Sequence, residues 1–309
     1  MRPVLEPGSD EEGIADALRA LCRASLGDRV DASDDFPFSF WQDLAGFGFF
    51  ALAAEDGFGG AVDLYAAAQV LGAFGAPGPL ADAIFAAQHP LPERGALLAG
   101  SEIAVLCRPP YIPWGKAATI LLLDEGAAVR RVRLVGDAAE QRTLAGDIWL
   151  KGELEATDKV PGCERAAHLR DIFLSGYLRG ALGRLVEEVS AYVSSRRQFG
   201  KALSQFQGVS FPLAEAGVLL RAMTALGRQA AFAADHGPAP HAHAVAARLS
   251  AMKAVNRIVP AVHQVYGAIG VTRDGPVFHL SRRLRQLVNL YGAGAPGARL
   301  NAHQEAEGA

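Results

Sequence analysis

Apolar residues recur at steps of three and four positions through most of the C-terminal half of the chain. This spacing places them along one side of a helix, so it predicts four long amphipathic helices after about residue 162. Short breaks separate them at Phe199-Gly200, at His236-Gly-Pro238 and around Gly267-Ala-Ile-Gly270. Four such helices with short connections are typical of a four-helix bundle. The repeating positions are Leu178, Leu182, Leu185, Val189 and Tyr192; Leu213, Ala216, Leu220 and Met223; Leu249, Met252, Val255, Val259 and Val262; and Leu280, Leu284, Leu287 and Tyr291.

The first hundred residues are also predicted to be mainly helical. Residues 38–52 form an aromatic-rich helical stretch, and residues 64–74 resume the helical spacing. Between them, Glu55-Asp-Gly-Phe-Gly-Gly60 is predicted to turn, because its glycines adopt positive φ at little steric cost.

The stretch from residue 101 to residue 160 has a different pattern. Short apolar runs occupy residues 103–107 and 119–123, and apolar and charged residues alternate over residues 129–135. Such runs are typical of strands, and Asp124-Glu-Gly126 indicates a hairpin turn. We therefore expect a mainly α protein with an N-terminal helical domain (1–100), a small middle β domain (101–160) and a C-terminal four-helix bundle (161–309).

Composition narrows the classes of partner and compartment. A net charge of −3 gives no general reason to expect nucleic acid or an anionic membrane as a partner. Cys22, Cys107 and Cys163 stand far apart without metal-ligand or redox spacing, which fits free thiols in a reducing compartment. No basic-then-apolar leader opens the chain, and no uninterrupted apolar run is long enough to cross a bilayer. We therefore expect a cytoplasmic protein without a metal site.

Several stretches resemble one known family. Arg196-Arg-Gln-Phe-Gly200, followed by Phe206-Gln207 and Leu213-Ala-Glu215, is similar to the R-x-Q/T-F-G stretch of acyl-CoA dehydrogenases and the Q and L-A-E/D-M that follow it. Gln264-Val-Tyr-Gly-Ala-Ile-Gly270 with Asp274-Gly-Pro276 resembles the family's Q-x-x-G-G-x-G-F/Y-x-x-E/D-x-P, with Ala268 in place of the second glycine. In the first region, residues 40–49 and 55–60 resemble W-x-x-L-x-x-x-G and P-E-x-x-G-G. The resemblance covers nearly the whole chain and is weakest over residues 101–160.

The resemblance implies FAD bound across a subunit interface. In the family, the arginine of the R-x-Q/T-F-G turn reaches the FAD of a neighbouring subunit, and a guanidinium suits the diphosphate because it makes bidentate, charge-assisted bonds. The glutamine that follows lies near the adenosine half, and the Q-x-x-G-G turn passes the phosphates and ribose. Carried over, the cofactor-binding residues are Arg196, Gln198, Phe199, Gln207, Gln264 and Gly267.

The same residue types also have plainer interpretations. A pair of arginines at a helix end usually complements the negative end of the helix dipole. Phe199 and Phe206 are compatible with ordinary core positions. The arginines at 282, 283 and 285 are compatible with a solvated or salt-bridged helix face, and also with contact to FAD phosphates or CoA.

The residues that carry the family's chemistry are missing. In the family, a glutamate removes the proton α to the thioester carbonyl while the β hydride goes to the flavin. Its position in the Y-E-G-T turn is Gly292 here, and its other known position is Lys253, which is protonated at neutral pH unless burial lowers its pKa. The threonine of that turn is Gly294, and the substrate-facing arginine falls near Asp171. Trp149 lacks the serine or threonine that follows the family's tryptophan near the flavin ring.

These losses concern the flavin ring and the thioester, whereas the retained residues concern the far end of FAD. The chain therefore resembles the shorter, incomplete subunit of heteromeric bacterial acyl-CoA dehydrogenases, which often act on steroid side chains or other bulky acyl-CoA esters. The expected function is FAD-dependent α,β-desaturation of an acyl-CoA, with this chain as a non-catalytic partner in a homo-oligomer or beside a longer homologue. Two alternatives stay open: a self-sufficient enzyme with a relocated base, and a flavin-free scaffold or acyl-CoA-binding protein.

Overall fold

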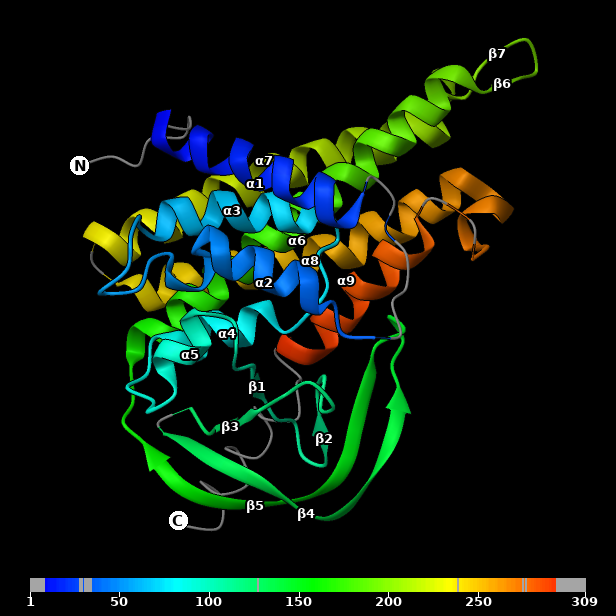
Figure 1. Ribbon diagram of the computed structural model, residues 1–309. Coiled ribbons are helices and arrows are strands. Elements are labelled where there is room, and N and C mark those ends of the chain that lie inside the picture. Colours follow the sequence, from blue (N-terminus) through cyan, green and yellow to red (C-terminus); the bar gives the residue numbers. More distant parts are fainter. Residues whose placement is uncertain are drawn as a thin grey trace, which may run out of the picture.

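Helices precede and follow a five-stranded mixed sheet in the middle of the chain (Figure 1). The computed structural model describes residues 9–27, 30, 35–126, 128–237, 239–273, 275 and 277–292 of the 309. The N-terminal elements are α1 (Ser9–Leu26), α2 (Phe38–Phe47), η1 (Phe49–Ala51), α3 (Ala61–Ala73), α4 (Leu80–Ala87) and α5 (Arg94–Leu98). The C-terminal elements are α6 (Glu164–Ser195), η2 (Leu203–Gln205), α7 (Gln207–His236), α8 (Pro240–Tyr266), η3 (Gly267–Val271) and α9 (Phe278–Tyr291). The four helices predicted from the periodic pattern are thus confirmed.

The middle of the chain forms a five-stranded sheet in the order β1-β3-β4-β5-β2. Its strands are β1 (Ala104–Leu106), β2 (Tyr111–Ile112), β3 (Ile120–Asp124), β4 (Val129–Arg142) and β5 (Ile148–Val160). β1 and β3 are parallel, and the remaining neighbours are antiparallel. The turn predicted at residues 124–126 does connect the antiparallel strands β3 and β4. In Figure 1 the long strands β4 and β5 curve beneath the helices and shield the smaller strands.

The sequence pattern missed β5 and half of β4. Most residues of β5 are exposed or only half-buried, and so are those of β4 beyond Leu134. A strand without a buried face has no alternation of apolar and polar residues, and alternation is the signal that predicts strands. Register shifts between Arg130 and Val132 and between Val135 and Ala139 also interrupt the regular pairing of the two strands.

Two glycines allow α3 to pack closely against α6. A Cβ on Gly72 would lie 1.9 Å from the carbonyl oxygen of Tyr177, and a Cβ on Gly180 would lie 1.9 Å from that of Gln69. Only glycine permits such an approach of two helix backbones. The first hundred residues are therefore fixed against the longest helix of the bundle, in a core that also includes Trp41, Tyr65 and Phe173.

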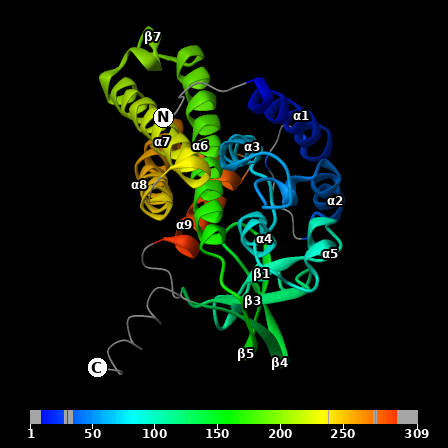
Figure 2. The same ribbon diagram turned by 90° about the vertical axis from the view of Figure 1, so that its left-hand side faces the viewer.

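The helices α6, α7 and α8 run alternately up and down, so the end of α6, the start of α7 and the end of α8 lie at the same end of the bundle. Figure 2 shows α6 and α7 extending together toward this end, beyond the N-terminal helices. The opposite end of the bundle and α9 face the sheet, as both views show. Two regions are therefore candidates for function: the end of the bundle where α6 ends and α7 begins, and the region between the bundle and the sheet.

Candidate functional site

A short hairpin projects from the bundle between α6 and α7 (Figure 1). Its strands, β6 (Arg197–Gln198) and β7 (Lys201–Ala202), pair with each other, and its turn consists of Phe199 and Gly200. The φ values of the turn are 51° and 79°, the left-handed geometry that matches the twist of a two-residue hairpin. We call residues 196–202 the hairpin arm.

Phe199 stands at the tip of the hairpin arm and is 91% exposed. The interpretation of Phe199 as a core residue is therefore wrong. Positive φ is uncommon for a bulky residue, so the arm holds this ring in solvent at a conformational cost. Three more exposed apolar side chains lie at the same end of the bundle: Phe211 near the start of α7, and Ile269 and Val271 of η3. A cluster of exposed apolar residues at one end indicates a surface that contacts another protein.

The other predicted cofactor residues lie at this end as well. Gln207 is the first residue of α7, and Gln264 lies in the last turn of α8. Gly267 follows α8 with a φ of 63°, which glycine adopts readily. The rings of Tyr192 and Tyr266, whose centroids are 4.8 Å apart, join the ends of α6 and α8. The structure therefore gathers all six predicted residues at one end of the bundle.

The polar members of this set share one property. Each side chain is exposed, and none makes a hydrogen bond or ion pair within the part of the chain that the structure describes. They are Arg196, Gln198, Gln207 and Gln264. The plainer interpretation of the arginine pair, complementing the end of α6, also matches the position of Arg196 directly after Ser195. These four groups are therefore available to hydrogen-bond a diphosphate or a ribose that is bound to another chain.

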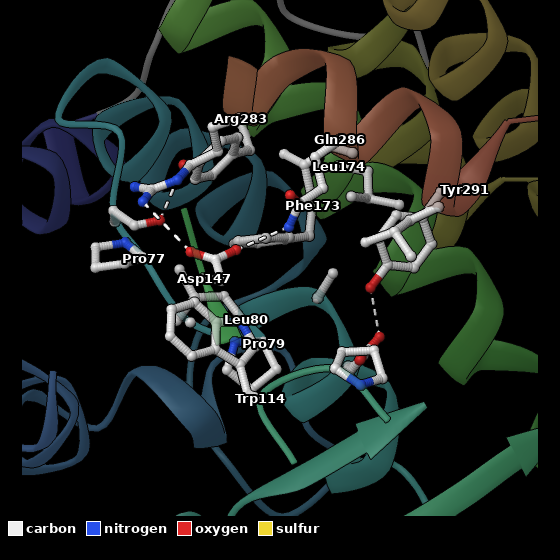
Figure 3. Close-up of a pocket in the computed structure, with 18 of the residues that line it drawn as sticks. Pro77, Pro79, Leu80, Trp114, Asp147, Phe173, Leu174, Arg283, Gln286 and Tyr291 are labelled. Carbon is white, nitrogen blue, oxygen red and sulfur yellow. Dashed lines mark hydrogen bonds and ion pairs between the residues drawn. The ribbon is translucent and has the colours of Figure 1, made fainter. Parts of the chain in front are cut away.

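A small cavity lies in the second region, where α4, α6 and α9 meet the sheet (Figure 3). Its volume is about 50 Å³, room for a few water molecules. Sites that hold a cofactor or a drug-sized ligand are about 300–1,000 Å³. Side chains from distant segments fill the space between the elements, among them Trp114, Asp147, Phe173, Arg283, Gln286 and Tyr291.

Asp147 occupies one side of this cavity. Gln286 Nε2 donates to Asp147 Oδ2 at 2.8 Å, and Arg283 Nη2 lies 3.9 Å from Asp147 Oδ1. Burial raises the pKa of the Asp147 carboxyl above its usual range, and the guanidinium of Arg283 opposes this effect only in part. Arg283 also donates to the carbonyl of Gly75, so it is bonded on both sides.

Tyr291 occupies the other side. Its hydroxyl donates to Asp82 Oδ1, and the backbone N–H of Leu106 donates to Asp82 Oδ2 at 2.9 Å. Burial raises the pKa of both Asp82 and Tyr291. Arg248 donates to the backbone carbonyl of Tyr291, and the guanidinium of Arg108 lies 5.2 Å from the centre of its ring. The last residue of α9 is thus held from both sides.

Comparison with known proteins bears on both regions. The model of the acyl-CoA dehydrogenase C-terminal domain matches residues 172–295, which include the hairpin arm and α9. The short-chain specific acyl-CoA dehydrogenase of Clostridium acetobutylicum is 30% identical over 95 residues, which are 31% of this chain and 25% of that protein. A 3-sulfinopropanoyl-CoA desulfinase of Paraburkholderia xenovorans is 31% identical over 94 residues, which are 30% of this chain and 24% of that protein. The matched stretch spans about a quarter of the length of these relatives.

Solved structures match over nearly the whole chain. A chain of the ChsE4–ChsE5 complex from Mycobacterium tuberculosis superposes with a TM-score of 0.78 at 19% identity, covering 99% of both chains. Butyryl-CoA dehydrogenase from Megasphaera elsdenii superposes with a TM-score of 0.75 at 16% identity, covering 98% of this chain and 99% of that one. The chain carries an acyl-CoA dehydrogenase C-terminal domain over residues 172–295 and has the acyl-CoA dehydrogenase fold as a whole.

Against that family, the positions of the base are informative. Gly292 follows α9 in an extended conformation, and a Cβ there would lie 2.5 Å from the carbonyl oxygen of Val288. Lys253 is exposed on α8 and does not line the cavity. Asp171, near which the family's substrate-facing arginine falls, is buried between Arg248 at 2.9 Å and Arg170 at 3.3 Å. The two base positions carried over from the family thus hold a glycine and an exposed lysine, and Asp171 is held by two arginines.

The arginines at 282, 283 and 285 do not form one face. Arg283 is buried beside Asp147, Arg282 lies over the ring of Phe278 at 4.6 Å, and Arg285 is exposed. Other sequence predictions fall on Asp274, Pro276 and Gly294, which lie outside the described residues. The polar network of Asp82, Asp147 and Gln286 was not predicted, because its members come from distant parts of the chain.

Proposed function

We propose that this chain is a non-catalytic acyl-CoA dehydrogenase-family subunit that completes the FAD site of a neighbouring subunit for α,β-desaturation of an acyl-CoA. The proposal rests on the contrast between the hairpin arm and the cavity beside the sheet. The hairpin arm presents Arg196 and Gln198 to solvent without partners in their own chain. The cavity where α4, α6 and α9 meet the sheet has a volume of only about 50 Å³.

The residues at the arm end fit the far half of FAD. A diphosphate is recognised by a guanidinium through parallel, charge-assisted hydrogen bonds, and Arg196 is free to make them. Glutamine amides at 198, 207 and 264 offer both donors and acceptors, which suit ribose hydroxyls and an adenine edge. Gly267 allows close approach of a ligand, because nothing lies within 4 Å of a Cβ built there.

The cavity is too small for a flavin ring. Asp147 Oδ2 and the Tyr291 hydroxyl are engaged with Gln286 and Asp82, whereas Asp147 Oδ1 and Trp149 Nε1 have no hydrogen-bond partner among the described residues. FAD bound between subunits would accept the hydride from the acyl-CoA, and the base would come from the neighbouring chain. This chain would contribute binding and orientation of the cofactor.

Structural relatives support a heteromeric assembly. The ChsE4–ChsE5 structure is a complex of two proteins, and the Tcur3481–Tcur3483 steroid ACAD, with a TM-score of 0.77 at 20% identity and 99% coverage of both chains, is described as a pair as well. A longer homologue with an intact glutamate would be the corresponding partner here. The exposed Phe199 and Val271 would then be covered by that partner.

Substitution of Arg196 tests the proposal. In the assembled complex, Arg196→Ala should weaken FAD binding about 10- to 100-fold, because a charge-assisted hydrogen bond contributes about 1.5–3 kcal/mol. Arg197→Ala is the matched control. It removes the same charge from the same hairpin, but alternation along a strand places residue 197 on the opposite face from residues 196 and 198.

The readout is FAD retained after gel filtration, with the dissociation constant from flavin fluorescence. Normal FAD affinity in Arg196→Ala, or an equal loss of FAD affinity in both variants, would contradict the proposal that Arg196 binds FAD. Equal losses would mean that only the general charge of the hairpin arm matters.

A further inference from the structure

A second pocket lies where the turn between β4 and β5 meets the start of α9. Its volume is about 390 Å³, within the range of about 300–1,000 Å³ that is usual for pockets that bind small organic ligands. Its described lining includes three arginines and a histidine but no acidic residue. We call it the basic pocket. Its charged, hydroxyl-bearing and aromatic lining residues are Arg142, Thr143, Arg273, Phe278, His279 and Arg282.

Hydrogen bonds of Gln286 hold the turn against α9. Gln286 Oε1 accepts from the backbone N–H of Ala145 at 3.1 Å, and Gln286 Nε2 donates to Asp147 Oδ2 at 2.8 Å. Within the turn, the N–H of Thr143 donates to the carbonyl of Asp147 at 2.9 Å, and the N–H of Gly146 donates to the carbonyl of Thr143 at 3.2 Å. This wall of the basic pocket is therefore already ordered, so a ligand loses little affinity in ordering it.

Two arginines of the basic pocket lack the carboxylate partners that many other arginines of the chain have. Arg131, for example, pairs with Glu93 at 2.8 Å. Arg273 and Arg282 make no ion pair within the described part of the chain. The chain as a whole carries a net charge of −3, so its composition does not account for a pocket with only basic charged residues. Such a pocket attracts an anion.

Arg282 is well placed to hold that anion. Its guanidinium lies 4.6 Å from the centre of the Phe278 ring, a contact that orients the planar group and leaves its N–H groups to bond at its edge. The side chain is half-buried, so an ion pair made there is screened less than one on the open surface. Phe278 is the first residue of α9, and the partial positive charge at a helix N-terminus also favours an anion.

Thr143 offers the pocket a hydroxyl group. Its Oγ1 is buried and has no hydrogen-bond partner among the described residues. A buried hydroxyl without a partner is costly, so a ligand that bonds to it relieves that cost. A hydroxyl beside guanidinium groups suits a phosphoryl group, because its three terminal oxygens accept hydrogen bonds from several directions. A carboxylate has only two oxygens in one plane and makes less use of such a set of donors.

We propose that the basic pocket binds the phosphoryl group of a phosphorylated organic ligand through Arg273, Arg282 and Thr143. The volume exceeds the need of a phosphate alone, and the exposed Leu144 and the Phe278 ring offer apolar contacts to the rest of the ligand. None of the six residues assigned to FAD lines the basic pocket. The inference therefore stands apart from the function proposed above.

Calorimetric titration of the full chain with ADP tests the proposal, with adenosine as the ligand that lacks phosphate. ADP should bind and adenosine should not. Arg282→Ala should weaken ADP binding about tenfold or more, because it removes a charge-assisted hydrogen bond. Arg285→Ala is the matched control, since Arg285 is exposed on the same helix and does not line the basic pocket. Arg196→Ala should also leave ADP binding unchanged, which separates the basic pocket from the arm end.

Three results would overturn the proposal. The first is failure of both ADP and inorganic pyrophosphate to bind the full chain. The second is equal weakening of ADP binding by Arg282→Ala and Arg285→Ala, which would mean that only the general charge of α9 matters. The third is loss of FAD from the assembled complex in Arg282→Ala, which would make the basic pocket part of the FAD site. Loss of FAD in Arg196→Ala alone leaves the two sites separate, as proposed.

Thr143→Val separates ligand binding from folding. The substitution nearly keeps the shape of the side chain and removes a hydroxyl that has no partner within the described part of the chain. The free chain should therefore unfold at the same temperature or a higher one, whereas ADP binding should weaken about 3- to 10-fold. Thermal unfolding with and without ADP measures both effects. A lower unfolding temperature of the free chain with unchanged ADP affinity would show that the hydroxyl is structural and would contradict its assignment to the ligand.

Discussion

Gly292 stands at the position where, by the resemblance, the family has a glutamate in one of its two arrangements. The preceding residue, Tyr291, is held by a hydrogen bond to Asp82 and by Arg248 at its carbonyl. Both oxygens of Asp82 already accept hydrogen bonds, from the Tyr291 hydroxyl and from the backbone N–H of Leu106, so this acid is engaged within the chain. The position of the family's base thus follows a residue that buried polar contacts hold beside a cavity of about 50 Å³.

This argument predicts that restoring the base does not restore the reaction. Gly292→Glu should give no acyl-CoA-dependent bleaching of flavin when the chain is incubated alone with FAD and substrate, because a cavity of about 50 Å³ cannot admit a flavin ring beside a thioester. Gly292→Ala is the control, since it introduces the same contact of Cβ with the Val288 carbonyl at 2.5 Å. Bleaching by the glutamate variant alone would show that the site is competent and only lacks its base.

Local patterns predicted the residues of the arm but not those of the cavity. Arg196, Gln198 and Gln207 fall within one short stretch, so their spacing is readable from the sequence. The bond between Asp147 and Gln286 joins residues 139 positions apart, and that between Asp82 and Tyr291 spans 209 positions. No pattern along the chain connects such pairs, because only the fold brings them together.

Whether a helix or strand could be predicted from the sequence depended on whether one of its sides is buried. The second half of α6 and the whole of α8 each bury one side, which imposes the apolar period that predicted them, whereas β5 is largely exposed and has no period to detect. The same reasoning separates α7 from the others. Its period was read as a buried face, but apolar residues also continue over its outer side, and periodicity does not distinguish a core contact from a subunit contact.

The contact between α3 and α6 gives a prediction for stability. Gly180→Ala should lower the free energy of unfolding by about 1–3 kcal/mol or more, because a Cβ 1.9 Å from the Gln69 carbonyl forces the two helices apart. Gly13→Ala in α1 is the matched control, since nothing lies within 4 Å of its Cβ, and it should raise stability by about 0.5–1 kcal/mol. Urea denaturation measures both. A neutral Gly180→Ala would mean that α3 and α6 are less closely packed.

In the whole molecule, the features that bear on function lie at different ends. The small cavity lies at the sheet end, and the side chains of Arg196, Gln198, Gln207 and Gln264 are exposed at the arm end. The outer side of α7 is apolar and largely exposed. Under the proposed function, the arm end offers Arg196, Gln198, Gln207 and Gln264 to FAD from one side. A cofactor held there would be incomplete in its contacts until a second chain covers the other side, so FAD binding and assembly should be linked.

This linkage predicts how the chain and its complex respond to FAD. A ligand that binds only the folded complex stabilises it by about 2.7 kcal/mol at 100 times its dissociation constant. The complex should therefore unfold at a higher temperature with FAD, whereas the chain alone should be colourless and show no shift, because its own cavity admits no flavin. A complex built with Arg196→Ala should lose most of the shift, and one built with Arg197→Ala should keep it. A chain that is yellow by itself and is reduced by acyl-CoA would instead establish the self-sufficient enzyme. A complex that never binds FAD would establish the flavin-free scaffold.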